Sequence, residues 1–286
     1  MILVTGATGT VGGHLVDQLS RSGTPVRALV RSQERADVLR GYDCEIAIGS
    51  YDDPQSLHRA LAGVTKVFLL SPPSEQMAEQ ELAVLTAVRT AHGDCHVVKL
   101  AALGVDGEVA GARLLEQHRS VVDALIEHGQ PHTVLAPNSF MQNFLFWAGS
   151  VQEQAAFYTP TGQGAVSHVD ARDVAAVAAH VLTSDGHDGA TYTVTGPQAL
   201  TYTEVAERFS TALGKTVSYV DVPPDGARAA MVDGGLSPWL ADGLVELNAR
   251  YRTGAASVVT DEVRTATGHE ARTVEAFLGD HLTAFR

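Results

Sequence analysis

A glycine-rich turn between an apolar run and a helical pattern constrains this chain more than any other feature. The run from Ile2 to Val4 shows no polar alternation, which is typical of a strand buried on both faces of a parallel sheet. Gly6, Gly9 and Gly12 follow at three-residue spacing, and an apolar helical pattern resumes at Val11. A strand, a glycine turn and a helix in this order predict a phosphate-binding element.

Each glycine has a physical task in such an element. Gly6 permits a tight turn, Gly9 lets the backbone approach a pyrophosphate, and Gly12 lets the helix lie close to the strand. The start of the helix offers unpaired N–H groups and the positive end of its dipole to the phosphates. The motif therefore predicts dinucleotide binding, and the alternative is a glycine turn that merely joins a strand to a helix.

Composition limits the class of protein. With 286 residues, the chain can form one large domain or two coupled ones, and it can bury a substantial core. The hydrophobic fraction of 45% and the charged fraction of 19% are ordinary for a globular protein. The net charge of −13 argues against a nucleic-acid partner, which would require a basic face.

Cysteine and histidine usage gives no sign of a metal site. Cys44 and Cys95 lie in separate expected strands, without metal-ligand spacing, and are interpreted as reduced, buried thiols. The 12 histidines are scattered along the chain. No signal-peptide pattern is seen, and no apolar run reaches the roughly 18 residues that a membrane span needs. We expect a cytoplasmic protein without metal and without membrane association.

Strand-like and helical patterns alternate along the first two thirds of the chain, which predicts a parallel sheet covered by helices on both faces. The expected strands are Pro25–Val30, Cys44–Ile48, Lys66–Ser71, His96–Ala101, Thr133–Ala136 and Thr191–Thr195. Capping residues mark several helix ends: Asp53 before Pro54, Ser74, Gly129, and the pair Thr201 and Glu204.

The pattern changes after Ala136. Residues 137–146 are expected to form a loop with aromatic side chains, and Val166–Val169 a short strand. Asp170 and Asp173 are interpreted as capping residues of the next helix, and the chain from Gly196 onward as mostly helical. We expect this second part to pack over the carboxyl ends of the strands, where open parallel sheets bind ligands.

The residue after the second strand predicts the form of the cofactor. An acidic residue there would hold the ribose hydroxyls, whereas an arginine accommodates a 2′-phosphate. Arg31 occupies this place, with Arg35 just beyond it. A charge-assisted hydrogen bond of this kind contributes about 1.5–3 kcal/mol, or roughly tenfold to hundredfold discrimination. NADP(H) is therefore expected in preference to NAD(H), the alternative being that Arg31 is a solvated surface charge.

The order of several segments resembles one family throughout nearly the entire chain. TGATGTVG resembles the start of the short-chain dehydrogenases. With Val26–Arg31, Asp53–Leu57, Val67–Ser71, His96–Leu100, Asn138–Phe144 and Gly196–Tyr202, the chain resembles the NmrA-like atypical short-chain dehydrogenases. This family includes NADPH quinone oxidoreductases, triphenylmethane and azo reductases, and redox-sensing regulators.

The resemblance implies a Rossmann-type doubly wound parallel α/β sheet with a smaller, mainly helical C-terminal substrate region. Residues 1–137 plus 165–197 would form the cofactor domain, and 138–164 plus 198–286 the substrate domain. The implied cofactor-binding residues are Gly6, Thr8, Gly9, Thr10, Val11, Gly12, Arg31, Leu70, Ser71, Lys99, Pro137 and Phe140. Phe140, Asn143, Phe144 and Trp147 would line the substrate pocket, unless they are ordinary core aromatics under a loop.

The sequence departs from the usual catalytic pattern of short-chain dehydrogenases, which place a serine after the fifth strand and a tyrosine–lysine pair on the next helix. Ala101 and Ala102 follow the strand here, and Leu114 and His118 stand where the pair would align. His118 is the titratable candidate left at that place, either as a proton donor or as a structural helix residue. Two further positions depart from the family pattern: Ser50 stands where an aspartate commonly follows the glycine, and Ala136 where an arginine commonly precedes the proline. These departures put the contacts on the adenine side and the anchoring of the loop in doubt, but not the fold.

Two functions of different classes remain. The first is an NADPH-dependent reductase that acts on quinones or related flat, conjugated small molecules, because such acceptors need little beyond cofactor orientation and an apolar slot. The second is a non-catalytic NADP(H) sensor that controls a protein partner. The missing serine, tyrosine and lysine favour the sensor, and the aromatic loop favours the enzyme. If the protein forms an oligomer, the expected form is a homodimer.

Overall fold

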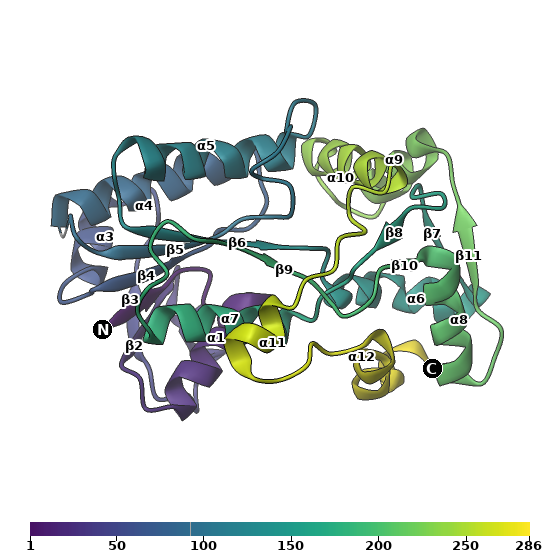
Figure 1. Cartoon of the computed structure of the whole chain (residues 1–286), viewed down its shortest axis with the longest axis horizontal. Coiled ribbons are helices and arrows are strands. Elements are labelled where there is room, and N and C mark those ends of the chain that lie inside the picture. Colours follow the sequence, from purple (N-terminus) through teal and green to yellow (C-terminus); the bar gives the residue numbers. More distant parts are fainter. Residues whose placement is uncertain (92) are drawn as a thin grey trace.

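A seven-stranded parallel sheet dominates the fold, and its strand order is β3-β2-β1-β4-β5-β6-β9 (Figure 1). The computed structural model describes residues 1–91 and 93–286. The strands are β1 Ile2–Val4, β2 Val26–Val30, β3 Glu45–Ile48, β4 Lys66–Leu69, β5 His96–Leu100, β6 His132–Pro137 and β9 Thr191–Val194. The direction in which strands are added reverses between β1 and β4, where sheets of this kind bind ligands beyond the carboxyl ends.

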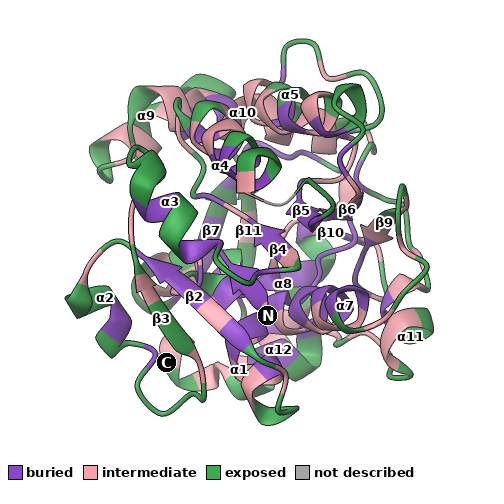
Figure 2. Ribbon diagram, turned by 90° about the vertical axis from the view of Figure 1, so that its left-hand side faces the viewer, coloured by how far each residue is buried: buried purple, intermediate pink, exposed green. Residues whose placement is uncertain are grey.

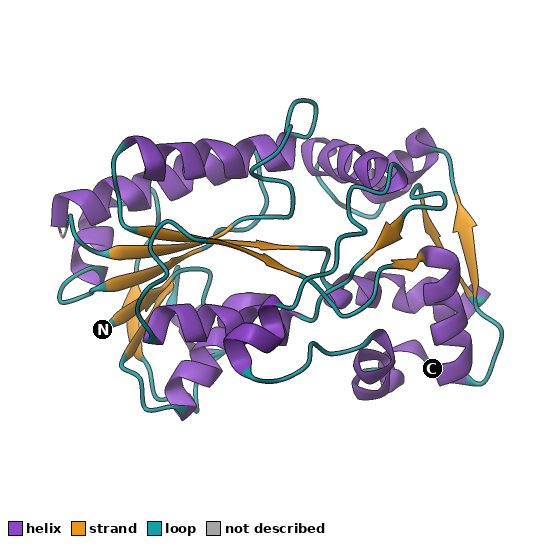
Figure 3. Cartoon of the chain, in the orientation of Figure 1, coloured by secondary structure: helices purple, strands orange, loops and turns teal. Residues whose placement is uncertain are grey.

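Helices cover both faces of this sheet (Figure 3). On one face lie α1 Thr10–Arg21, α7 Ala171–Thr183 and α11 Glu262–Thr267, and on the other α3 Pro54–Ala60, α4 Met77–Ala91 and α5 Arg113–Glu127. The short helix α2 Gln33–Asp37 follows β2. The predicted Rossmann-type doubly wound sheet is confirmed.

Burial on both faces explains the unbroken apolar run of the first strand. Ile2 and Val4 pack in the core that includes α1 and α7, whereas Leu3 points to the opposite core under α3 and α4. Because successive side chains alternate between faces, a strand covered on both sides needs apolar residues at every position. Figure 2 shows the inner strands as largely buried, whereas the edge strand β3 is largely exposed.

A smaller region lies beyond the carboxyl end of the sheet, on the right of Figure 1. Two small sheets form there: β7 Ala156–Thr159 pairs in parallel with β11 Ser218–Asp221, and β8 Ala165–Val166 pairs antiparallel with β10 Leu200–Thr201. The helices are α6 Ala148–Gln154, α8 Tyr202–Leu213, α9 Pro224–Asp233, α10 Pro238–Arg252 and α12 Val274–Asp280, with short 3₁₀ helices η1 Met141–Trp147 and η2 Leu282–Phe285.

Aromatic side chains fill the core of the smaller region. The rings of Trp147 and Phe157 stack with centroids 4.2 Å apart, and Phe144 stacks on Trp147 at 5.1 Å. Phe209 and Phe277 meet the edge or face of Phe144 at 5.9 Å. Such aromatic pairs add to the free energy gained by area burial, by about 0.5–1.5 kcal/mol each.

Most of the predicted capping residues lie at the expected helix ends. The Asp53 carboxylate accepts from the backbone N–H groups of Gln55 and Ser56, with Pro54 first in the helix. Thr201 and Glu204 form a reciprocal capping box at the start of α8. Gly129 has a φ of +61° just beyond α5. At Ser74 the prediction is less accurate, because α4 begins only at Met77.

Other predictions for the second part need correction. The strands β7, β10 and β11 were not expected, and the strand expected over Val166–Val169 is the shorter β8. Residues 141–147, largely inside the expected loop, form η1. Strands of two to four residues carry weak local signals, and their hydrogen bonds here join segments far apart in the chain, such as Tyr158 and Val220. Sequence pattern alone does not show such pairing.

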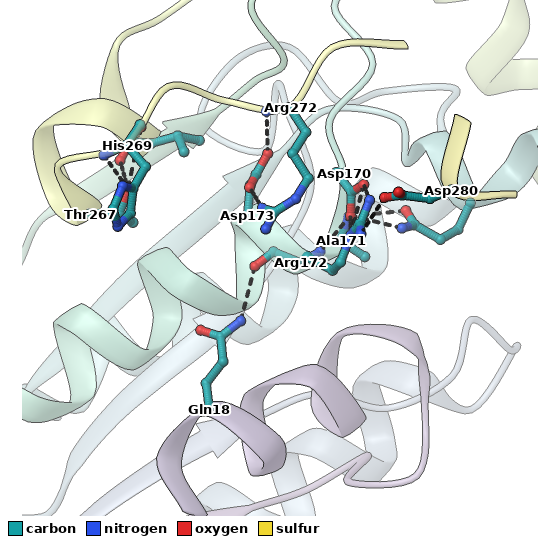
Figure 4. Close-up of polar contacts among 11 residues, drawn as sticks. Gln18, Asp170, Ala171, Arg172, Asp173, Thr267, His269, Arg272 and Asp280 are labelled. Atoms are coloured by element: carbon teal, nitrogen blue, oxygen red, sulfur yellow. Dashed lines mark hydrogen bonds and ion pairs between the residues drawn. The ribbon is translucent and has the colours of Figure 1, made fainter. Parts of the chain in front are cut away.

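Ion pairs join the start of α7 to the C-terminal segment (Figure 4). The fully buried Asp170 accepts from the backbone of Arg172 as a helix cap and also binds its guanidinium at 2.6 Å, and Arg172 reaches Asp280 at 2.7 Å. Asp173 accepts from the backbone and side chain of Arg272. Asp170 therefore has the predicted capping role, whereas Asp173 holds the C-terminal segment through Arg272.

Among the described residues, no helix combines the length and apolar character needed to cross a bilayer.

His168 makes folding stability sensitive to acid. It is 2% exposed, lies between the rings of Phe144 and Tyr202, and neither ring nitrogen makes a regular hydrogen bond to another described side chain or backbone group. Burial lowers the pKa of His168 to about 3, and the nearby Ser139 backbone opposes this only partly. In the unfolded chain this histidine takes up a proton near pH 6.5, whereas in the folded chain it does not. Protonation therefore favours the unfolded chain, and the free energy of unfolding falls as the pH drops below about 6.5.

We expect replacement of His168 by leucine to reduce this acid sensitivity. Between about pH 7.5 and about pH 5, the loss of unfolding free energy should be about 2 kcal/mol smaller in His168→Leu than in the unsubstituted protein. Urea unfolding followed by tryptophan fluorescence measures the difference. His58→Gln, which alters an exposed histidine, is the control. Equal pH dependence in all three proteins would contradict the assignment.

Candidate active site

The glycine loop between β1 and α1 is held by close backbone contacts. Gly6 has a φ of +59°, and its carbonyl accepts from the N–H of Gly9 at 2.9 Å. A Cβ atom on Gly12 would lie 2.2 Å from the Gly6 carbonyl oxygen, so this position cannot carry a side chain without moving the loop. Thr5 fastens the loop to the neighbouring strand, because its hydroxyl bonds to the carbonyl of Phe68 and to the backbone of Leu70.

The start of α1 is open toward an anion. Its N-cap residue Gly9 provides no side-chain acceptor, and the first turn contains no acidic residue. Gly9 and Thr10 are exposed. The first N–H groups of the helix therefore lack an intrahelical partner and point, with the positive end of the dipole, toward the loop. These residues fit the pyrophosphate of a dinucleotide.

A cleft of about 430 Å³ lies along the carboxyl ends of β1, β2, β4 and β5. It begins at the glycine loop, extends on one side to Arg31, Arg35 and Tyr51, and on the other to Leu100 and Phe140. Leu70 and Ser71 form its wall after β4. The cleft lies at the predicted position between β1 and β4, and it brings together most of the residues expected to bind the cofactor.

Two guanidinium groups mark the end of the cleft near β2. Arg31 and Arg35 are exposed and both line it. The Arg31 guanidinium lies 6.0 Å from the ring centre of Tyr51, whose hydroxyl donates to the Leu70 carbonyl at 2.9 Å. Ser50 also lines this end of the cleft. The charge and polar groups here suit a phosphorylated ribose.

Lys99 does not line the cleft, although the resemblance implied that it binds the cofactor. It is fully buried, and its Nζ lies 2.6 Å from Oε2 of Glu81 on α4, which is also fully buried. Nζ donates to the Leu100 carbonyl at 2.5 Å and lies 3.2 Å from Nδ1 of His118 on α5. The other Glu81 oxygen accepts from the backbone and hydroxyl of Ser71 at 3.0 and 3.1 Å. A continuous polar chain thus runs from Ser71 at the cleft to His118.

Burial controls the protonation of this chain of residues. It lowers the pKa of Lys99, while the adjacent Glu81 carboxylate opposes the shift. Burial and the Lys99 charge together hold the pKa of His118 well below its usual range. His118 is therefore a neutral imidazole near pH 7, half-buried rather than sealed in the core. It is not among the residues that line the cleft.

Glu246 of α10 places the helix that carries His118. Its carboxylate accepts from the backbone N–H of Arg113 at the start of α5, and also binds the Arg113 guanidinium at 2.7 Å. The same guanidinium reaches Asp242 at 3.4 Å. Figure 1 shows α10 continuing beyond the end of α5. Glu246 was not predicted from the sequence, because a carboxylate 133 residues away from the helix start gives no local capping signal.

The remaining predicted site residues are divided between the cleft and the core. Phe140 is half-buried and reaches the cleft, Pro137 is buried at the end of β6, and Asn143 is exposed. Phe144 is fully buried, and Trp147 is half-buried against Phe157, so both belong to the aromatic core of the smaller region. Phe144 and Trp147 are therefore packed as ordinary core aromatics, which was the alternative to a place in the substrate pocket.

Among the described residues, no group of three or more histidine, cysteine, aspartate or glutamate side chains is placed to hold a metal ion.

Comparison with known proteins gives matches over nearly the whole chain. The NmrA-like family matches residues 1–278. An NAD(P)H azoreductase from Xenophilus azovorans is 39% identical over 287 residues, which cover 100% of this chain and 99% of that protein.

Solved structures of similar proteins superimpose closely. An NADPH-dependent quinone oxidoreductase from Escherichia coli, complexed with NADPH, has a TM-score of 0.89 at 28% identity, covering 99% of this chain and 100% of that chain. A triphenylmethane reductase from Citrobacter sp., complexed with NADP(H), has a TM-score of 0.86 at 28% identity, covering 98% and 100% of the two chains. Together, the sequence match and the shared structure show that this chain belongs to the NmrA-like family.

Proposed function

We propose that the protein is an NADPH-dependent reductase that transfers hydride to a quinone or a similar flat, conjugated acceptor. The observation that carries the proposal is the cleft, which begins at an uncapped helix N-terminus and ends at Leu100 and the half-buried Phe140. A dinucleotide with its pyrophosphate on α1 would extend along this cleft. The azoreductase, quinone oxidoreductase and triphenylmethane reductase among its relatives support a nicotinamide cofactor and a conjugated acceptor.

The preference for NADPH rests on the end of the cleft near β2. Arg31 and Arg35 are solvent-accessible there, so either can turn toward a 2′-phosphate. A guanidinium matches the geometry of a phosphate and retains its charge at any physiological pH. NADH lacks this phosphate and would gain nothing from these two charges.

The chemistry asks little of the protein. Bound NADPH supplies the hydride, and a quinone accepts the two electrons because its reduced form is aromatic. The chain must hold both partners in contact and exclude water. The oxygen that becomes negative also needs a proton, and Ala101, Ala102 and Leu114 cannot provide one. We assign this role to His118, which does not line the cleft but is joined to Ser71 at the cleft wall through Lys99 and Glu81. Its neutral ring has one N–H to donate, and the adjacent Lys99 ammonium can replace that proton on the other ring nitrogen.

The second candidate function is a redox sensor that binds NADP(H) without catalysis and controls a protein partner. The absence of the serine, tyrosine and lysine at Ala101, Ala102, Leu114 and His118 favours this alternative. A sensor should prefer one redox state of the cofactor and leave acceptors unchanged.

Three further expectations stay predictions. They are the division into a cofactor domain (1–137 plus 165–197) and a substrate domain (138–164 plus 198–286), the homodimer, and the cytoplasmic location.

We expect saturable oxidation of NADPH by quinones above the uncatalysed rate. Phe140→Ala should raise KM by removing one wall of the acceptor slot, and His118→Gln should lower kcat by about a hundredfold by removing the proton donor. Absorbance at the NADPH band measures turnover, and His128→Gln, which alters the exposed residue at the C-terminal end of α5, is the control. Tight NADPH binding without acceleration would favour the sensor, and no binding would contradict both functions.

We expect Arg31→Ala to weaken NADPH binding by roughly tenfold to hundredfold, because one charge-assisted phosphate contact is lost. NADH binding should stay nearly the same. Cofactor fluorescence titrations with both dinucleotides measure the ratio, and Arg40→Ala, an exposed arginine outside the cleft, is the control. If Arg31→Ala weakens NADPH and NADH binding equally, Arg31 does not read the 2′-phosphate.

A further inference from the structure

The Lys99–Glu81 pair is unusual because both side chains have no solvent exposure. Removing two charges from water costs several kcal/mol per ion in real proteins, and replacing such a pair by apolar residues is often neutral or stabilising. A buried pair is therefore weak evidence for a contribution to stability. Its position points elsewhere, because Glu81 holds Ser71 at the wall of the cleft and Lys99 contacts His118.

The chemistry of the lysine decides how the histidine ring is protonated. The Glu81 carboxylate at 2.6 Å favours the charged ammonium form of Lys99. An ammonium group has three donors and no lone pair, so Nδ1 of His118, 3.2 Å away, must accept from it. The single proton of the neutral imidazole is then on Nε2. Nε2 of His118 has no hydrogen-bond partner among the described residues and is not among the buried unpartnered side-chain atoms, so this edge of the ring is open to solvent.

We propose that Lys99 is a positioning residue that fixes the Nε2–H form of His118 and replaces the proton which His118 donates. This inference rests on the proposed reductase function. During reduction, the acceptor gains two electrons and one hydrogen as hydride, and its oxygen takes the Nε2 proton. At the same time the N–H bond of the Lys99 ammonium breaks and a proton moves to Nδ1. The acceptor leaves as the neutral hydroquinone, His118 stays neutral, and Lys99 becomes an amine.

The relay resets with one proton from solvent. Water protonates the accessible Nε2, the Nδ1 proton returns to Lys99, and the starting form is restored. The lowered pKa of Lys99 makes the donation less costly, and the Glu81 charge draws the proton back. The titratable groups facing this relay are Glu81 from α4, His118 from α5, and Tyr51, whose own pKa is raised mainly by burial and partly by Glu81.

The first test reads the tautomer in the cofactor-free protein. In ¹⁵N-labelled protein, two-dimensional NMR at about pH 7.5 should show His118 with a protonated Nε2 and an unprotonated Nδ1. The double variant Lys99→Met/Glu81→Gln removes both charges and keeps an oxygen for Ser71, so that no lone buried charge is left to prevent folding. In this variant the two ring nitrogens should share the proton, and His118 should titrate at higher pH. A protonated Nδ1 in the unsubstituted protein would overturn the proposal.

The second test measures turnover with two quinones. In the double variant, kcat for a quinone with a weakly acidic hydroquinone should fall roughly tenfold to hundredfold, because that product needs a proton during transfer. For tetrachloro-benzoquinone, whose reduced form ionises readily, the fall should be much smaller. The dissociation constant for NADPH should stay within about twofold. Lys66→Met, which removes the lysine at the start of β4 that donates to the Ser184 carbonyl, is the matched control.

The outcomes separate this inference from the proposed function. No turnover by the unsubstituted protein would contradict the reductase function, whereas the NMR result would still decide the tautomer. Turnover with an equal loss for both quinones, or a change in KM alone, would overturn the role of Lys99 and leave the reductase intact. A larger loss for the proton-demanding quinone, with the predicted tautomer, would establish it.

Discussion

The structure depends on a parallel sheet that is buried on both faces. Because all seven strands are parallel, their carboxyl ends lie at one edge of the sheet, and the right-handed crossovers between them place the connecting helices on its two faces. The strands on either side of β1 are reached by connections that run in opposite directions, so the helices diverge there and leave a crevice. The cleft, the glycine loop and the polar chain of Ser71, Glu81, Lys99 and His118 all lie at that edge. The site is therefore a consequence of the layer arrangement.

The smaller region contributes to the site through helix positions. The carboxylate of Glu246 replaces the cap that Ala112 cannot provide, so α10 determines where α5 begins. At the other face, the pairs of Arg172 with Asp280 and of Arg272 with Asp173 hold the C-terminal segment against α7. Charged groups thus connect the two parts of the chain on both sides of the sheet. A small displacement of α5 would alter the distance between His118 and Lys99, which lie on different elements.

In our proposal, the polar chain beside the cleft supplies acid chemistry in place of the tyrosine and lysine that short-chain dehydrogenases generally use. Desolvation keeps His118 neutral, and an adjacent ammonium determines which nitrogen carries the proton. Both effects need low local dielectric, which the covering helices α4 and α5 provide. Burial likewise explains the low pKa of His168, but this ring lies in an aromatic core, and neither of its nitrogens has a hydrogen-bond partner among the described residues.

Sequence by itself determined the features that depend on neighbours in the chain. The spacing of Gly6, Gly9 and Gly12 predicted the loop, and the caps at Asp53 and Thr201 predicted helix starts, because each works through backbone groups a few residues away. Only the tertiary structure decided the features that join distant segments. The Lys99 side chain, expected at the cofactor, is instead buried in the protein interior, where it pairs with Glu81. Phe144 is packed in the core rather than at the cleft. The side-chain direction of such residues follows from the groups that surround them after folding, and those groups come from elements that are far apart in sequence.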